Sequence, residues 1–317
     1  MDNLTHSLVG AVLGQLGLKT KTGLAMPTLI IAANLPDIDA ACATYGIESL
    51  SMRRGITHGP IALLLLPLVL WALMLAFDRW QDRRGKRPAN RLPIHRGWLL
   101  ALAYIGCLSH PALDWLNNYG IRLLEPFSHR WFYGDTLFII DLWIWIALGL
   151  SVWLSLRRER RGIANWQRPA WIGFVAVCAY IFANGLITGA AERMASDALR
   201  AGGKGDALVV ASPPPLAFWK RDIFWRTADR YGSASFIPGV GGKVDIGGAP
   251  TGMDDPRLAT WVKADPAARA FLFWARMPVA DVDGEAIILS DQRFTHPLSR
   301  KNFTIRITAP ETASYPE

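Results

Sequence analysis

Residues 61–77 read IALLLLPLVLWALMLAF and carry no charged side chain. A helix needs about 17–25 apolar residues to cross the hydrocarbon core of a bilayer, so this stretch predicts a membrane-spanning helix. Residues 170–191 also lack charge, and residues 137–156 carry only Asp141. The apolar stretch 97–109 is shorter, and we expect it to span with help from its flanks. Together these stretches predict an α-helical multi-spanning membrane bundle.

Two apolar stretches near the start of the chain, residues 7–18 and 24–35, are too short to span. They predict a helical hairpin that is either packed inside the bundle or crosses the membrane incompletely. The chain opens with MDNLTH, which lacks the short basic region of a secretory signal peptide. We therefore expect the first helix to remain part of the protein.

The basic side chains are concentrated beside the apolar stretches. The formal net charge is +8, and residues 78–96 hold seven Arg or Lys while residues 157–168 hold five. Nucleic-acid binding would explain such clusters, but the cytoplasmic loops of membrane proteins also collect Lys and Arg. Because both clusters flank apolar stretches directly, we expect membrane lipids as partners and no nucleic acid. No feature of the sequence fixes an oligomeric state.

With both basic loops on the cytoplasmic side, several ionisable residues fall at the outer ends of the helices, although none of them entered the charge argument. They occur in the segments THSLVG (5–10), NLPDID (34–39), RRGITHGP (53–60) and SHPALDW (109–115). The converging residues are His6, Asp37, Asp39, His58, His110 and Asp114.

Imidazole and carboxylate side chains together suit a divalent metal ion. Ionisable residues at membrane depth are costly and usually functional. Mixed nitrogen and oxygen donors suit zinc, and also manganese or iron. His110 and Asp114 are four residues apart, so they lie on one face of a helix and can reach the same ion. Each motif alone has an ordinary explanation, such as a helix cap or an Asx turn, so the prediction depends on their combination.

Five segments, in order, carry a family resemblance: THSLVGAVLG, NLPDID, RRGITHG, SHPALDWLNNYG and LLEPFSHRWFYGDTLFIIDLW. They resemble the predicted membrane-bound metal-dependent hydrolases, a bacterial inner-membrane family, over roughly residues 1–190. The resemblance implies a multi-pass protein of the bacterial inner (cytoplasmic) membrane with a metal-hydrolase activity. It also implies a similarity to zinc-dependent phospholipase C.

The family's motifs can be carried over residue by residue. The metal ligands then fall on His6, Asp37, His58, His110 and Asp114.

Asp39 is the second aspartate of the family's PDxD motif, and we expect it to act with Asp37 in catalysis. The histidine that usually opens the family's HRGxTH motif is replaced here by Arg53. An arginine does not ligate a cation, but its planar guanidinium can grip a phosphate. Arg53 and Arg54 are therefore candidates either for binding an anionic substrate or for anchoring the loop at lipid head groups. His129 is a further substrate-binding candidate on the same side.

Composition changes near residue 192. We expect a membrane-embedded helical metal-site domain over residues 1–191 and a small α+β extracytoplasmic C-terminal domain over residues 192–317. The second domain contains short β-like runs, the first ALVVAS (207–212) and the last FTIRITA (303–309). A helix is expected over 261–277, broken near its start by Pro266, and a hairpin turn at Asp283-Gly284. His296 is expected to be structural.

Three functions fit these features. The first is a metal-dependent hydrolase at the outer face of the inner membrane, acting by metal-activated water on a phosphoester or lipid-linked substrate, with zinc as the first candidate cofactor. The second is a transporter or ion-handling protein, although the ionisable groups gather at one end and no repeat of two halves is visible. The third is a structural or regulatory membrane protein in which a metal fastens helix ends together.

Overall fold

The computed structural model describes residues 1–295 and 300–310, so His296 lies outside the described residues. The chain divides into two compact units. The helical unit consists of Met1–Asp39, Arg54–Thr188 and Ser212–Trp219. The sheet unit consists of Ala40–Arg53, Gly189–Ala211 and the described residues from Lys220 onward. An N-terminal helical region is thus followed by a C-terminal antiparallel β-sheet region, in agreement with this part of the expected fold class.

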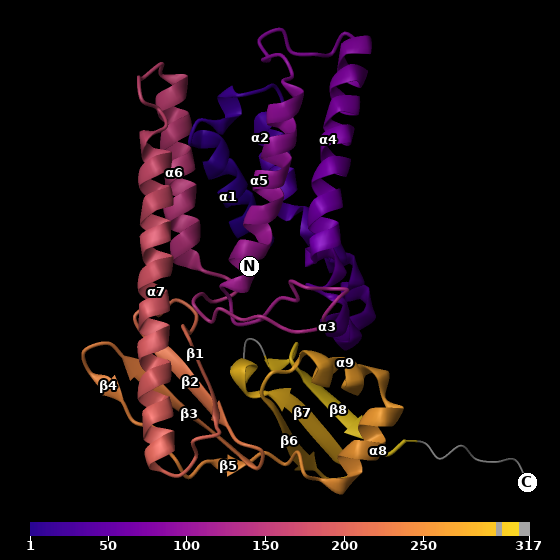
Figure 1. The fold of residues 1–317 in the computed structure, drawn as a ribbon, viewed down its shortest axis with the longest axis vertical. Coiled ribbons are helices and arrows are strands. Elements are labelled where there is room, and N and C mark those ends of the chain that lie inside the picture. Colours follow the sequence, from indigo (N-terminus) through magenta and orange to yellow (C-terminus); the bar gives the residue numbers. More distant parts are fainter. Residues whose placement is uncertain (296–299, 311–317) are drawn as a thin grey trace, which may run out of the picture. The chain divides into compact units, whose positions relative to one another are not determined.

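Long helices that alternate in direction build the helical unit (Figure 1). α1 packs on α2, α5 and α6, and α5 packs in addition on α2 and α4. One hydrophobic core cluster contains Val12 of α1, Ile144 and Leu148 of α6 and Val177 of α7. The bounds are α1 (Asn3–Gln15), α2 (Ala25–Asn34), α4 (Pro60–Arg83), α5 (Arg96–Trp115), α6 (Leu142–Arg160) and α7 (Arg168–Ala201), the last of which continues into the sheet unit.

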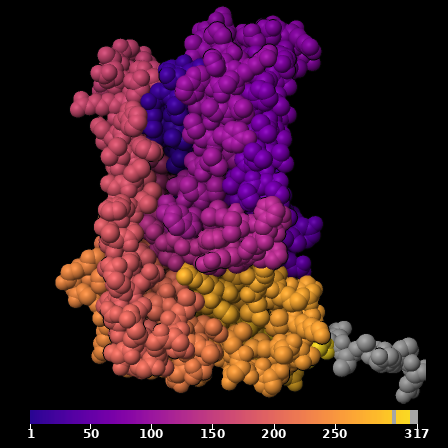
Figure 2. All heavy atoms as spheres, in the orientation of Figure 1, coloured from indigo at the N-terminus to yellow at the C-terminus, as the bar shows by residue number. Residues whose placement is uncertain are grey.

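The first two helices form the expected short hairpin. Their 13 and 10 residues rise about 20 Å and 15 Å, less than the ~30 Å of a bilayer core. Leu29 and Ala32 of α2 are fully buried. A Cβ atom on Gly10 would lie 2.8 Å from the Leu29 carbonyl oxygen, so glycine allows α1 to approach α2 closely. On the face drawn in Figure 2, the hairpin (indigo) is visible in a strip between the later helices.

Two helices of the described chain, α4 and α7, are long and apolar enough to cross a membrane. Only 17% and 22% of their apolar windows are buried, so most of this surface faces outward from the protein. They confirm the spans expected at 61–77 and 170–191 as candidates. α5 carries His110 and Asp114, and α6 ends in an arginine cluster, which makes both less uniformly apolar.

The prediction of one apolar helix over residues 137–156 is wrong in its first five residues, because α6 begins at Leu142. The Asp141 carboxylate caps this helix by accepting hydrogen bonds from the backbone N–H groups of Trp143 and Ile144. It also accepts a hydrogen bond from the Tyr180 hydroxyl of α7 at 2.8 Å. A capping carboxylate satisfies the first amides of the helix, so the chain before it is free to run as a loop.

Within the helical unit, α4 and α6 end where α5 and α7 begin (Figure 1). The two basic stretches, residues 78–96 and 157–168, therefore lie at one end of this unit. The opposite end carries the beginning of α4 and the end of α5, which is where the sequence places His58 and Asp114.

The sheet unit holds two antiparallel sheets, one of five strands with the order β1-β2-β3-β4 and β5 on β3, the other with the order β6-β7-β8. The expected β-like runs all form strands. The strands are β1 (Leu208–Ser212), β2 (Arg221–Arg226), β3 (Arg230–Ile237), β4 (Gly241–Gly242), β5 (Ala249–Pro250), β6 (Pro278–Asp283), β7 (Ala286–Asp291) and β8 (Thr304–Thr308).

Local signals in the sheet unit explain its turns and helix ends. Asp283 pairs with Ala286 across a tight hairpin, in which Gly284 has φ 62°, as the Asp-Gly pair predicted. Asp265 ends α8 (Pro256–Ala264) and caps α9 (Pro266–Trp274), so the predicted break at Pro266 is confirmed. The boundary expected at residue 192 lies inside α7, which runs on to Ala201.

Candidate metal centre

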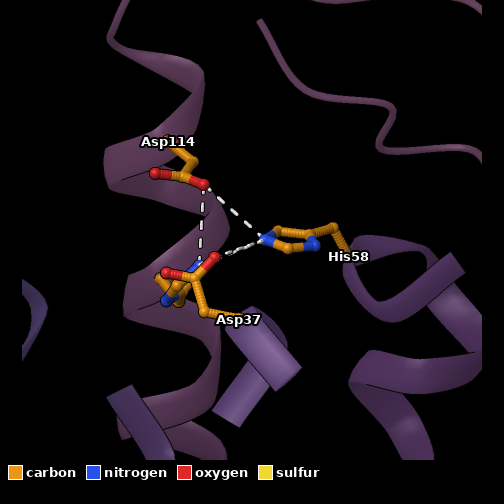
Figure 3. Close-up of side chains that lie close together, drawn as sticks. Asp37, His58 and Asp114 are labelled. Carbon is orange, nitrogen blue, oxygen red and sulfur yellow. Dashed lines mark hydrogen bonds and ion pairs between the residues drawn. The ribbon is translucent and has the colours of Figure 1, made fainter. Parts of the chain in front are cut away.

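Four ionisable side chains from three segments meet at one end of the helical unit. Figure 3 shows three of them, Asp37, His58 and Asp114, directed toward one another. Asp37 lies on η2 (Leu35–Glu48), His58 ends η3 (Ile56–His58), and His110 and Asp114 lie one turn apart on α5. One donor atom of each lies within 4.8 Å of all the others. The residues are only 0–7% exposed. Buried polar groups need hydrogen-bond or ionic partners, so these four side chains require groups that satisfy them.

The spacing of the donor atoms fits one metal ion. Two ligands held ~2.0–2.1 Å from a tetrahedral zinc ion lie about 3.3 Å apart. Five of the six donor–donor separations are 3.1–3.9 Å, around and slightly above this value, and all six lie within 4.8 Å. The five are His58 Nε2–His110 Nε2 3.1 Å, His110 Nε2–Asp114 Oδ2 3.5 Å, His58 Nε2–Asp114 Oδ2 3.6 Å, His110 Nε2–Asp37 Oδ1 3.7 Å and His58 Nε2–Asp37 Oδ1 3.9 Å.

The far side of each imidazole is held by an oxygen atom. His110 Nδ1 lies 2.7 Å from the Ala33 carbonyl oxygen, which can only accept a hydrogen bond. His58 Nδ1 lies 2.9 Å from Thr57 Oγ1 and 3.4 Å from Asp39 Oδ2, and the Thr57 hydroxyl donates to the same Asp39 oxygen. This is the usual surrounding of metal-ligating histidines. With the proton on Nδ1, each ring presents the lone pair of Nε2 to the shared centre.

Burial sets the charge states around His58. Burial lowers the pKa of His58 to about 4, although its hydrogen bond with Asp39 acts in the opposite direction, so the imidazole is neutral and able to ligate. For Asp39, burial raises the pKa, but hydrogen bonds from His58, Thr57 and the Arg54 backbone N–H outweigh it and lower the pKa. Asp39 is therefore an ionised carboxylate directed at the back of the His58 ring.

Asp114 uses its two oxygens for different neighbours. Arg54 Nε lies 2.9 Å from Oδ2, the oxygen that faces the four-residue group. Oδ1 receives the Met1 ammonium group and lies 3.3 Å from His6 Nε2. The His6 ring stacks on His110 with centroids 3.7 Å apart, and neither of its nitrogens has a hydrogen-bond partner within the described chain. His6 is thus an immediate neighbour of the group, on the other side of Asp114.

Arg54 is only 4% exposed and lies within the protein, not at a lipid surface. Its guanidinium donates to Asn117 Oδ1 at 2.9 Å and to the Gly120 carbonyl oxygen at 3.2 Å, and it lies over the Tyr119 ring. Its φ of 53° is a left-handed backbone conformation that side chains other than glycine rarely adopt. These contacts and the uncommon backbone conformation hold the Arg54 side chain in a fixed position beside Asp114.

The two remaining predicted residues lie outside the four-residue group. The His129 side chain is 67% exposed, and its Nδ1 lies 3.0 Å from both carboxylate oxygens of Glu125. Arg53 is half-buried and belongs to the sheet unit.

Sequence reasoning missed three groups that hold the site: the Thr57 hydroxyl, the Asn117 side chain and the Ala33 carbonyl oxygen. Thr57 precedes His58 directly and Asn117 follows the Asp114 motif, so both stood in segments already singled out. Their types gave a weak signal, since Ser, Thr and Asn most often make local hydrogen bonds to the backbone. Nothing in the sequence marks Ala33, because every residue type has a backbone carbonyl oxygen.

The family model of the YdjM inner membrane protein matches residues 1–191, which include all four donor residues and His6. No curated protein and no solved structure matches the chain. The matched range is more than half of the 317 residues, and it contains the motifs on which the resemblance to predicted membrane-bound metal-dependent hydrolases was based. The chain therefore belongs to the YdjM inner membrane protein family.

Proposed function

We propose that this protein is a metal-dependent hydrolase whose divalent cation is held by Asp37, His58, His110 and Asp114. The observation that carries the proposal is the approach of two imidazole Nε2 atoms to 3.1 Å, each with its Nδ1 tied to an oxygen acceptor. Two lone pairs facing each other at this distance repel unless a cation lies between them. Such a cation would lower the pKa of a water molecule to near neutrality and polarise the bond to be cleaved.

The remaining residues receive positioning roles. Asp39 and Thr57 fix the orientation of the His58 ring, so we propose Asp39 as a positioning residue and Asp37 as the carboxylate that contacts the cation. Arg54 fixes Asp114 through its guanidinium. His6 Nε2 lies 3.3 Å from the second oxygen of Asp114, and neither ring nitrogen makes a hydrogen bond within the described residues, which supports a role as an additional donor.

Two imidazole nitrogens and two carboxylate oxygens form a donor set that suits zinc first, and manganese or iron as alternatives. Metal analysis of the purified protein tests this assignment. We expect zinc to be retained through dialysis against buffer and removed by a chelator.

We propose that the site opens on the outer face of the inner membrane. Both arginine-rich loops lie at the opposite end of the helical unit, and basic loops are retained in the cytoplasm. Because α7 runs away from its basic flank, the sheet unit would then be extracytoplasmic. Reporter fusions at Gly85 and at Gly203 should report the cytoplasm and the outer side, respectively. The same side for both fusions would contradict the proposed orientation.

A phosphoester or lipid-linked substrate fits the position of the site at the ends of apolar helices, where a lipid head group meets water. The test is a screen of phosphoester and lipid substrates with zinc-loaded wild type beside Asp114→Asn. We expect turnover by the wild type and its loss in a variant that is still inserted and folded. Equal turnover in both would refute the assignment.

The burial of the four donors favours one second candidate, a structural metal that fastens α5 to the preceding loops. Structural zinc sites have four protein ligands and no open position, whereas catalytic sites keep one for water. If the metal is structural, a chelator should lower the unfolding temperature and no substrate should be turned over. If it is catalytic, turnover and metal content should fall together.

A further inference from the structure

A groove of about 370 Å³ lies along the C-terminal end of α6, at the end of the helical unit remote from the metal centre. All its lining residues belong to the end of α6 and the residue that follows it, so the groove is open toward the surroundings. The proposed hydrolase function does not use it. It is lined by Trp153, Leu156, Arg157, Arg160 and Arg161.

The groove carries positive charge that the protein does not neutralise. Among the described residues, no carboxylate lies within ion-pair distance of Arg157, Arg160 or Arg161. Glu159, the acidic residue in the same turn, is paired with Lys19. The negative end of the α6 dipole opposes an anion here, so attraction for an anion must come from the three guanidinium groups.

The other wall of the groove is apolar. Trp153 is 53% exposed and has the Arg157 guanidinium 5.3 Å from its ring centroid, and Leu156 lies beside it. These residues end the charge-free stretch 142–156, which rises about 22 Å along α6. The groove therefore sits where an apolar helix surface changes to a cationic one, a position at which tryptophan is enriched in membrane proteins.

We propose that this groove binds an anionic phospholipid. Guanidinium groups grip a phosphate with paired N–H donors, and basic pockets at helix ends attract anionic head groups. Trp153 and Leu156 would contact the glycerol and the upper acyl chain. A free polyanion would use only the charged wall, so the apolar wall favours a lipid as the occupant.

The test measures phosphatidylglycerol binding to the purified full-length protein in zwitterionic detergent, by native mass spectrometry. The groove variant is Arg157→Gln with Arg160→Gln and Arg161→Gln. The matched control, Arg83→Gln with Arg84→Gln and Lys86→Gln, removes the same charge at the end of α4. We expect the groove variant to lose affinity by a factor on the order of 100, since each arginine near an anionic surface contributes about fivefold, and the control to keep it. Equal losses, or none, would overturn the proposal.

Three further measurements make the test decisive. Replacing the three arginines by lysine keeps the charge if the glutamine variant fails to insert, and we expect weaker binding because lysine lacks the planar fork. Trp153→Ala should also weaken lipid binding. Unchanged binding in both variants would count against the groove. Inorganic phosphate should not displace the lipid at equal concentration, and full displacement would show that only a phosphate is recognised.

Discussion

His58 and His110 face each other through their Nε2 atoms at 3.1 Å, and the opposite nitrogen of each ring is held by oxygen acceptors from different parts of the chain. The two rings come from segments separated by the whole of α4. Their arrangement gives both imidazoles the tautomer that a metal ion requires, before any ion arrives. The candidate site is therefore organised by hydrogen bonds behind the donors as well as by the donors themselves.

His110→Ala should reduce bound zinc by a factor on the order of ten or more, because it removes one of the four proposed donors. The cation that Asp37 and Asp114 would share is then held less tightly. Elemental analysis of the purified protein measures this directly. His129→Ala provides the control, because its side chain is 67% exposed and outside the group. Equal zinc content in the wild type and in His110→Ala would contradict the assignment.

Asp39→Asn should lower zinc affinity about 10–100-fold, the usual cost of removing an outer hydrogen-bond partner of a ligating histidine. Thr57→Val should act in the same direction, because the Thr57 hydroxyl links Asp39 to the His58 ring. Competition with a fluorescent chelator gives both affinities. Thr44→Val is the matched control, since Thr44 is exposed and its hydroxyl donates a local hydrogen bond to the Ala41 carbonyl oxygen. An effect of Thr44→Val as large as that of Thr57→Val would point to a general loss of stability.

Arg54→Gly should destabilise the metal-free protein by about 1–3 kcal/mol, because the buried Asp114 Oδ2 loses its guanidinium partner while the Met1 ammonium group still pairs with Oδ1. Glycine accepts the positive φ of this position, so backbone strain does not add to the loss. Zinc should raise the unfolding temperature more in the variant than in the wild type, since the ion then supplies the missing positive charge.

Thermal unfolding in detergent, with zinc and with a chelator, measures this difference. Arg306→Ala breaks a solvent-exposed ion pair with Asp283 and should change stability by no more than about 1 kcal/mol. A smaller zinc effect in Arg54→Gly than in the wild type would refute the role given to Arg54.

Gly106→Ala should destabilise the protein by about 1–3 kcal/mol, the usual cost of overpacking. Its Cβ atom would lie 2.7 Å from Ala32 Cβ and 2.8 Å from the Leu29 carbonyl oxygen, so α5 and α2 would have to separate. Because His110 follows one turn later and is held by Ala33 of α2, zinc affinity should fall as well. Gly149→Ala on α6 is the control, since a Cβ there has no atom of the described residues within 4 Å apart from the neighbouring backbone of its own helix. Equal unfolding temperatures for the two variants would contradict this packing account.

Local signals in the sequence predicted much of the fold. The charge-free runs marked α4 and α7, and Pro266 and the Asp283-Gly284 pair marked a helix start and a hairpin. Such signals act within a few residues, through helix geometry, proline's fixed φ and turn chemistry. The start of α6 was misjudged because hydropathy alone does not reveal that Asp141 caps the helix.

The sequence by itself determined the chemistry of the candidate site: the types of its donors, and the i, i+4 spacing that places His110 and Asp114 on one helix face. Tertiary structure alone decided which atoms meet, with the Ala33 carbonyl behind His110, Asp39 behind His58 and Arg54 on Asp114. The physical reason is the distance along the chain over which each property acts. Side-chain type and helical periodicity are properties of neighbouring residues, whereas these hydrogen bonds and ion pairs depend on how α2, α5 and the loop before α4 pack together.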